Sequence, residues 1–171
     1  MFMIIKLRNI LEVKFMQKTN AMRFLDKNKI PYSTHEYDCK DGKIDGFAVA
    51  NKLNQDVNMV FKTLVVQGHS KELYVFVLPV AEELNLKKAA KVAGEKNVEM
   101  IHVKDINKHT GYIRGGCSPL AMKKLYKTFF HKSAENLDKI IFSGGKIGLQ
   151  IEANPKEVAQ AINAKFEDII A

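Results

Sequence analysis

The sequence predicts a single α+β domain, and three observations support this fold class. The chain has 171 residues, which fits one domain with a sizeable core. With 46% hydrophobic and 27% charged residues, its composition is typical of soluble globular proteins. Short apolar runs rich in β-branched residues interleave with helical segments, and the connections are short loops and hairpins. This order favours a compact α+β domain over a doubly wound one.

Caps and turn signals place the elements of the first half. Thr19 or Asn20 can cap a first helix, which stops at Ile30-Pro31. Strand, loop, helix and strand are then expected in order over residues 32–37, 39–46, 47–53 and 60–66. A turn at 68–71 leads into a second apolar run at 73–78, so these two strands are predicted to form a central hairpin.

The second half begins with a helix over 85–93, capped by Asn85 and terminated by Gly94. Strands are predicted at 98–103, around 129–130, at 139–142 and at 149–152, of which the last is the final strand. Asn154-Pro155-Lys156-Glu157 starts a last helix, with Asn at N-cap, Pro at N1 and Glu at N3.

Residues 1–15 are interpreted as an N-terminal extension outside a core domain of residues 16–171. Their apolar residues are too few and too interrupted to span a membrane. Basic residues lie within or after the apolar stretch, and no small-residue cleavage site follows, so the segment is a poor signal peptide. The hypothesis is that Met16 is the functional start.

The formal net charge is +8, and one segment carries all of it. Residues 87–132 hold eleven lysines and arginines against three acidic residues, a difference of 11 − 3 = +8. On charge alone, a solvated helix face is favoured over nucleic-acid binding. The 2 cysteines are too few for a metal site of their own or a disulfide framework, which indicates a reduced, cytoplasmic protein.

A candidate site emerges from one lysine and two glycine-rich loops. Lys62 is set inside the apolar strand 61–66, where its ammonium group must reach water or an anion. The loops are residues 110–119 and 143–149, in which backbone N–H groups can face a ligand. Together these features predict a site for an anionic, extended ligand.

The sequence contains no recognisable catalytic constellation. The glycines of the second loop do not form a phosphate-binding Gly-Lys-Ser/Thr loop, and the 5 histidines lack metal-ligand spacing. Cys117 could act as a nucleophile, but no histidine is assignable as its base, so a structural use is favoured. Ser118 and Ser143 could be either hydrogen-bond donors to a ligand or turn residues.

Several motifs occur in a fixed order along the chain. They are Phe61-Lys62-Thr63-Leu64, Leu86-Lys87-Lys88-Ala89-Ala90-Lys91, Val98-Glu99-Met100, Thr110-Gly111-Tyr112, Gly115-Gly116-Cys117-Ser118-Pro119 and Ser143-Gly144-Gly145-Lys146 with Gly148-Leu149. Together they resemble the YbaK family, free-standing relatives of the editing domain inserted in bacterial prolyl-tRNA synthetases. The resemblance covers the chain from about Met16 to Ile170.

The resemblance implies a barrel-like mixed sheet flanked by helices, and an aminoacyl-tRNA deacylase that removes cysteine from mischarged Cys-tRNA(Pro). In the implied mechanism the thiol of the substrate cysteine attacks the carbonyl of its own ester. This releases the tRNA and a cyclic thiolactone. Lys62 would hold the terminal adenosine or its phosphate. Backbone N–H groups of residues 115–118 would face the carbonyl oxygen.

The expected site residues follow from the same resemblance. The expected catalytic residues are Lys62, Gly115 and Gly116. The expected substrate-binding residues are Tyr37, Thr63, Tyr112, Cys117, Ser118, Pro119, Ser143, Gly144 and Gln150. Arg114, Lys146, Lys87, Lys88 and the rest of the basic segment would contact tRNA, chiefly tRNA(Pro). Prolyl-tRNA synthetase is a second expected partner, whereas no metal, organic cofactor or membrane is expected.

Two departures from the family pattern leave alternatives open. Gln150 stands where the family often has an aspartate. Ile44-Asp45 stands where a pocket aromatic residue is expected, with Phe47 as a candidate substitute. One alternative is therefore a non-catalytic module that binds tRNA or the synthetase. Another is trans-editing of Ala or Ser by hydrolysis.

Overall fold

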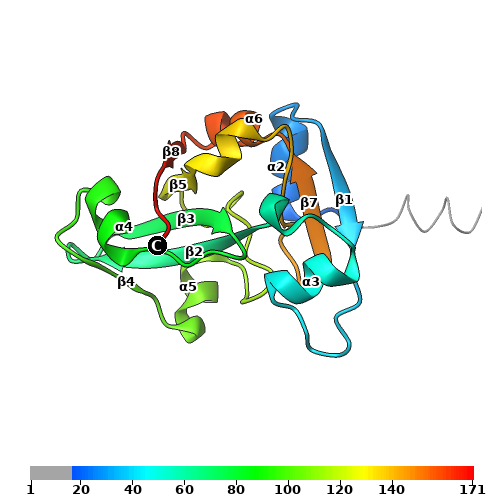
Figure 1. The fold of residues 1–171 in the computed structure, drawn as a ribbon, viewed down its shortest axis with the longest axis horizontal. Coiled ribbons are helices and arrows are strands. Elements are labelled where there is room, and N and C mark those ends of the chain that lie inside the picture. Colours follow the sequence, from blue (N-terminus) through cyan, green and yellow to red (C-terminus); the bar gives the residue numbers. More distant parts are fainter. Residues whose placement is uncertain (1–16) are drawn as a thin grey trace, which may run out of the picture.

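A computed structural model of the chain describes residues 17–171, which fold into two β-sheets and their covering helices (Figure 1). The proposed N-terminal extension, residues 1–15, and the proposed start at Met16 lie outside the described residues. Within residues 17–171 no helix is both long and apolar enough to cross a lipid bilayer.

The larger sheet has five strands, in the order β4-β2-β3-β5-β8. The strands in this order are β4 (Val98–Met100), β2 (Phe61–Gly68), β3 (Leu73–Pro79), β5 (Lys127–His131) and β8 (Lys165–Glu167). β2 pairs antiparallel with β3 and places Lys62 opposite Leu78, which confirms the predicted central hairpin. β5 pairs parallel with both β3 and β8.

The smaller sheet has the order β1-β7-β6 and is antiparallel throughout. Its strands are β1 (Tyr32–Glu36), β7 (Leu149–Ala153) and β6 (Ile140–Ser143). A parallel bridge between Val60 and Ile141 joins the two sheets just before β2 begins. The main core contains buried residues of both sheets, including Val75 and Phe130 of the larger sheet and Phe142 and Ile151 of the smaller.

The predicted caps mark the starts of α2, α4 and α6, and Asp45 is a further cap that was not predicted from the sequence. The helices are α2 (Asn20–Lys27), α3 (Gly46–Lys52), α4 (Leu86–Ala93), α5 (Ile106–Thr110) and α6 (Pro155–Ala161). The side chains of Thr19, Asp45, Asn85 and Asn154 accept hydrogen bonds at the N-termini of α2, α3, α4 and α6. Gly94 ends α4 in the left-handed conformation, at φ 72°. Figure 1 shows α3 and α4 at opposite ends of the long axis of the molecule.

The structure corrects the sequence prediction in three places. β4 ends at Met100 rather than residue 103, because a 3₁₀ turn (Val103–Asp105) follows it. Helix α5 was not predicted, since its sequence INKHT has no apolar periodicity. β7 is not the last strand: β8 follows it. β8 has only three residues and pairs only with β5, so its sequence pattern is too short to recognise as a strand.

Candidate functional site

A cavity of about 620 Å³ opens where the start of β2 meets the loop before α3 and the facing ends of β6 and β7. Four segments supply most of its wall, residues 42–46, 60–64, 114–117 and 142–150. The lining residues are Tyr37, Gly42, Ile44, Asp45, Gly46, Val49, Val60, Phe61, Lys62, Thr63, Leu64, Val80, Arg114, Gly115, Cys117, Phe142, Ser143, Leu149 and Gln150. The predicted lysine and residues of both glycine-rich loops therefore meet in one place.

The cavity wall carries two cationic side chains, Lys62 and Arg114, and one carboxylate, Asp45. An oxygen of Asp45 already accepts a hydrogen bond from the backbone N–H of Ala48, at 3.0 Å. Lys62 is half-buried and forms no ion pair with any residue from 17 to 171. The excess positive charge fits the anionic ligand predicted from the sequence.

The two glycine-rich loops pack directly against each other, and Gly116 makes this possible. A Cβ atom built on Gly116 would lie 2.9 Å from the backbone nitrogen of Ile147 and 3.0 Å from the Cα of Lys146. Gly115, by contrast, has φ +84°, and its Cβ would lie 2.6 Å from Cδ1 of Ile44. Gly115 thus faces the cavity, whereas Gly116 is the contact between the loops.

Five of the predicted catalytic and substrate-binding residues do not line the cavity: Gly116, Tyr112, Ser118, Pro119 and Gly144. The Tyr112 hydroxyl donates to the backbone oxygen of Leu120 at 2.6 Å, and burial raises the pKa of Tyr112 to about 12. Ser118 is fully buried, and its Oγ accepts from the N–H of Leu120 at 3.2 Å. These residues hold the shape of the loops, because their polar atoms are engaged within the protein.

Pro119 and Gly144 are also accounted for by packing. Pro119 is buried and lines a separate, smaller cavity beside Phe24. The N–H of Gly144 donates to the backbone oxygen of Leu149 at 2.9 Å, which closes the second loop. Thr19 donates to the backbone oxygen of Gly144 at 2.6 Å, so the N-cap of α2 also anchors this loop.

The backbone donors of the first loop are fewer than the sequence suggested. The N–H of Gly116 donates to the backbone oxygen of Ile113 at 2.9 Å and cannot also face a ligand. Ser118 lies outside the cavity wall. Of residues 115–118, only Gly115 and Cys117 line the cavity. The prediction of a carbonyl-binding loop therefore narrows to the N–H groups of these two residues.

The polar floor of the cavity centres on Gln150, which is 6% exposed. Its Oε1 accepts from Nε2 of Gln55 at 2.8 Å, a partner that no sequence motif pointed to. Thr63 contributes a buried hydroxyl that has no partner among the described residues. Ser143 accepts from the N–H of Gly145 at 3.3 Å and keeps its own proton for a ligand.

The cysteine in the cavity, Cys117, is a neutral thiol. Burial raises its pKa to about 11, so at pH 8 about one thiol in a thousand is ionised. We expect iodoacetamide to alkylate the exposed Cys39 at least about tenfold faster than Cys117 at pH 8. Since the thiolate fraction rises about tenfold per pH unit below the pKa, the Cys117 rate should still climb between pH 8 and pH 10. Peptide mass spectrometry resolves the two rates, and equal rates at pH 8 would contradict this account.

The predicted tRNA-binding residues are spread over the molecule. Arg114 lines the cavity, and Lys146 is exposed on the second glycine-rich loop. Lys87 and Lys88 lie on α4, at the other end of the long axis from α3 (Figure 1). The ammonium group of Lys88 donates to Asp168 and to the backbone oxygen of Ile170, both at 2.9 Å. The ammonium group of Lys88 is therefore bound to the segment that follows β8 at the C-terminus.

Sequence reasoning connected the loop before α3 to the cavity only through the pocket aromatic residue expected at Ile44-Asp45. Gly42, Ile44, Asp45 and Gly46 all line the cavity, although they carry no motif of their own. Phe47, the candidate substitute for a pocket aromatic residue, does not line the cavity and is 49% exposed. It follows Gly46 on α3, where the helix turns its side chain out to solvent.

Comparison with known proteins gives consistent similarities. The sequence model of the family described as "Aminoacyl-tRNA editing domain" matches residues 47–163. A protein of Enterococcus faecalis (strain ATCC 700802 / V583), named "Putative Cys-tRNA(Pro)/Cys-tRNA(Cys) deacylase EbsC", is 43% identical over 156 residues, which are 91% of this chain and 95% of that protein.

Two solved structures share the fold. The crystal structure of "hypothetical protein APE2540" superimposes with a TM-score of 0.81 at 20% identity, covering 90% of this chain and 100% of that chain. The "Crystal structure of a putative trans-editing enzyme for prolyl tRNA synthetase" gives a TM-score of 0.76 at 18% identity, covering 91% and 99%.

Proposed function

This chain belongs to the aminoacyl-tRNA editing domain family, and we propose that it removes cysteine from mischarged Cys-tRNA(Pro) as a trans-editing deacylase. The family match and the 43% identical deacylase support the reaction class. The choice of cysteine rests on the chemistry of the cavity and on the resemblance given above, and the choice of tRNA(Pro) rests on the resemblance alone.

The observation that carries the proposal is that the described residues of the cavity wall include hydroxyl and thiol groups but no histidine to activate one of them as a nucleophile. The Cys117 thiol is neutral, since burial raises its pKa to about 11. The carboxylate of Asp45 is engaged as the N-cap of α3. A nucleophile supplied by the substrate itself, the cysteine thiol, needs none of these groups.

In the proposed reaction the sulfur of the esterified cysteine attacks its own carbonyl carbon. The thiol loses its proton, the carbon–oxygen ester bond breaks, and the ribose oxygen takes up a proton. The products are the cyclic thiolactone and tRNA with a free terminal hydroxyl. Intramolecular attack benefits from proximity, with effective molarities of about 10⁵ M or more for well-oriented groups. The protein then has to hold the ester and stabilise the developing charge.

The cavity residues divide naturally between these two tasks. Lys62 and Arg114 would bind the terminal phosphate or adenosine through charge-assisted hydrogen bonds. The N–H groups of Gly115 and Cys117 would face the carbonyl oxygen as it becomes negative. Tyr37, Thr63, Ser143 and Gln150 supply polar contacts for the amino-acid end.

The tRNA body would lie against basic residues outside the cavity, beginning with Arg114 and Lys146. Because Lys87 lies on α4 at the far end of the molecule, only a long stem could reach it together with the cavity. Binding of this kind weakens steeply with salt, since each phosphate contact releases counterions. A complex with prolyl-tRNA synthetase would bring the mischarged tRNA to the cavity.

The test is deacylation of Cys-, Ser- and Ala-charged tRNA(Pro), measured side by side with the wild-type protein. We expect rapid loss of cysteine alone, and no loss when its thiol is blocked by alkylation. Loss of serine or alanine at similar rates would instead identify hydrolytic editing with water as the nucleophile. Salt-sensitive tRNA binding with no loss of any amino acid would leave a non-catalytic binding module.

A further inference from the structure

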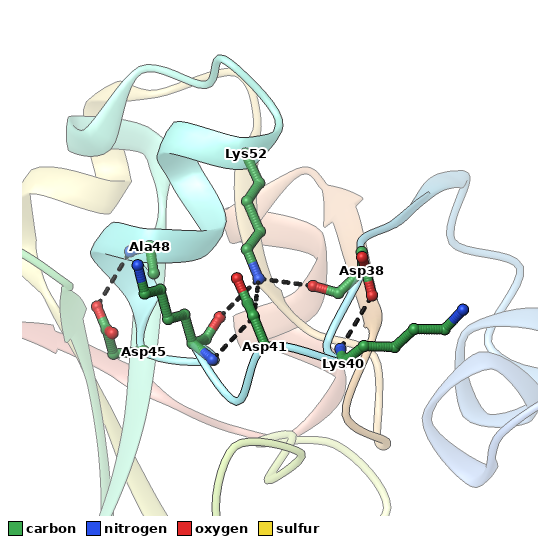
Figure 2. A network of polar contacts seen from close by, with 7 residues as sticks. Asp38, Lys40, Asp41, Asp45, Ala48 and Lys52 are labelled. Carbon is green, nitrogen blue, oxygen red and sulfur yellow. Dashed lines mark hydrogen bonds and ion pairs between the residues drawn. The ribbon is translucent and has the colours of Figure 1, made fainter.

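One lysine outside the cavity holds together the loop that forms a cavity wall. Figure 2 shows the side chain of Lys52, at the end of α3, reaching back to the loop that precedes this helix. Its Nζ lies 2.6 Å from the backbone oxygen of Asp38, 2.8 Å from Oδ1 of Asp41 and 3.0 Å from the backbone oxygen of Lys43. The Lys52 side chain is 23% exposed.

This arrangement uses the full donor capacity of the ammonium group. A lysine ammonium has three N–H donors, and here three oxygens of one loop surround it. The contact with Lys52 is also the first cause of a lowered pKa of Asp41. An isolated surface ion pair contributes little to stability. Lys52 differs because two of its three partners are backbone carbonyls, so it fixes the path of the chain itself.

The held segment leads directly into the cavity wall. Ile44 and Asp45 lie between Lys43 and α3 and line the cavity, as does Gly46, the first residue of the helix. Asp45 fixes the far end of the segment as the N-cap of α3. The side chain of Ile44 packs over Gly115, at the point where a Cβ of that residue would lie. The position of Ile44 therefore joins the loop before α3 to the first glycine-rich loop.

We propose that Lys52 is a positioning residue, which tethers the loop 38–43 so that Ile44 and Asp45 form the cavity wall against Gly115. The consequence for catalysis rests on the proposed function. Wall residues contact the aminoacyl end in the ground state and in the transition state alike. Loss of the tether is therefore expected to weaken substrate binding more than it slows the chemical step.

Limited proteolysis reads the tether without any activity measurement. Lys52 binds the carbonyl oxygen of the Lys43–Ile44 peptide bond, which is a trypsin site. In Lys52→Met the carbonyl oxygen of Lys43 loses this hydrogen bond, and the loop around the peptide bond can open locally. We expect trypsin to cleave the Lys43–Ile44 bond at least about tenfold faster than in the wild-type protein. Lys40→Met is the matched control. Lys40 lies in the same loop, but its ammonium group points away from Lys52 (Figure 2).

Steady-state kinetics with Cys-tRNA(Pro) then test the consequence. For Lys52→Met we expect KM to rise about 5- to 10-fold while kcat stays within about twofold, and for Lys40→Met neither to change by more than about twofold. The variant Lys52→Arg shows whether KM depends on the tether to the loop or on attraction of the positive charge to tRNA. A planar guanidinium keeps the charge but cannot direct three donors to these oxygens, so at least half of the KM increase should remain.

Each result decides the matter. Equal trypsin cleavage of Lys52→Met and Lys40→Met would overturn the tether. Faster cleavage with an unchanged KM would overturn the positioning role. Full recovery of KM in Lys52→Arg would make Lys52 a tRNA contact instead. A wild-type protein that deacylates no aminoacyl-tRNA would overturn the proposed function, and proteolysis would still report on the tether.

Discussion

Replacing Lys62 by alanine is expected to lower kcat/KM for Cys-tRNA(Pro) by at least about 100-fold, because a terminal adenosine that is no longer held in place leaves the ester misplaced for the intramolecular attack. Lys62 lies on the cavity wall and forms no ion pair with residues 17–171, so its charge is available to the ligand. Arg114 would remain as the other cation of the wall. Because only one of two cations is lost, the variant should still bind tRNA while it fails to turn over the ester.

The control for this prediction is Lys165→Ala. Lys165 is an exposed lysine at the start of the edge strand β8 and does not line the cavity. It should leave kcat/KM within about twofold of wild type, as for surface substitutions generally. Circular dichroism and urea denaturation establish that both variants are folded. A folded Lys62→Ala protein with normal turnover would refute the assignment of Lys62 to the active site.

The second large effect is expected for Gly116→Ala, although Gly116 does not line the cavity. An alanine Cβ would lie 2.9 to 3.0 Å from backbone atoms of Lys146 and Ile147, which cannot rotate out of the way. The two glycine-rich loops must therefore move apart. We expect a loss of about 1–3 kcal/mol in the free energy of unfolding, as for overpacked sites. Displacement of Gly115 and Cys117 should also cost about 100-fold in kcat/KM.

Gly94→Ala distinguishes a site effect from a general loss of stability. Gly94 ends α4 at φ +72°, and an alanine Cβ there would meet no atom of residues 17–171 within 4 Å beyond its own chain neighbours. Alanine therefore brings backbone strain without a clash, and that strain costs about 1–2 kcal/mol. Urea denaturation should show comparable destabilisation in both variants, whereas only Gly116→Ala should lose activity. Equal activity of the two would mean that the contact between the loops does not position the cavity.

Local signals along the chain were sufficient to predict most of the helices and strands. Thr19, Asp45, Asn85 and Asn154 precede helices and cap them, because their side-chain oxygens satisfy N–H groups that the helix leaves free. The hairpin of β2 and β3 follows from two apolar runs around a short turn. The exceptions are short. β8 has only three residues, so its pairing with β5 and not its own pattern makes it a strand.

For the cavity, the sequence alone predicted the kind of ligand. A lysine inside an apolar strand and two glycine-rich loops indicated an anionic ligand, and no recognisable catalytic constellation accompanied them. Which of these groups face the ligand depends on the tertiary structure. Folding turns Gly116 and Tyr112 inward as packing residues and brings Ile44 over Gly115. The physical reason is distance along the chain. A hydrogen bond such as that from Lys52 to Lys43, or from Gln55 to Gln150, depends on where the backbone returns, and no local pattern of residues records that.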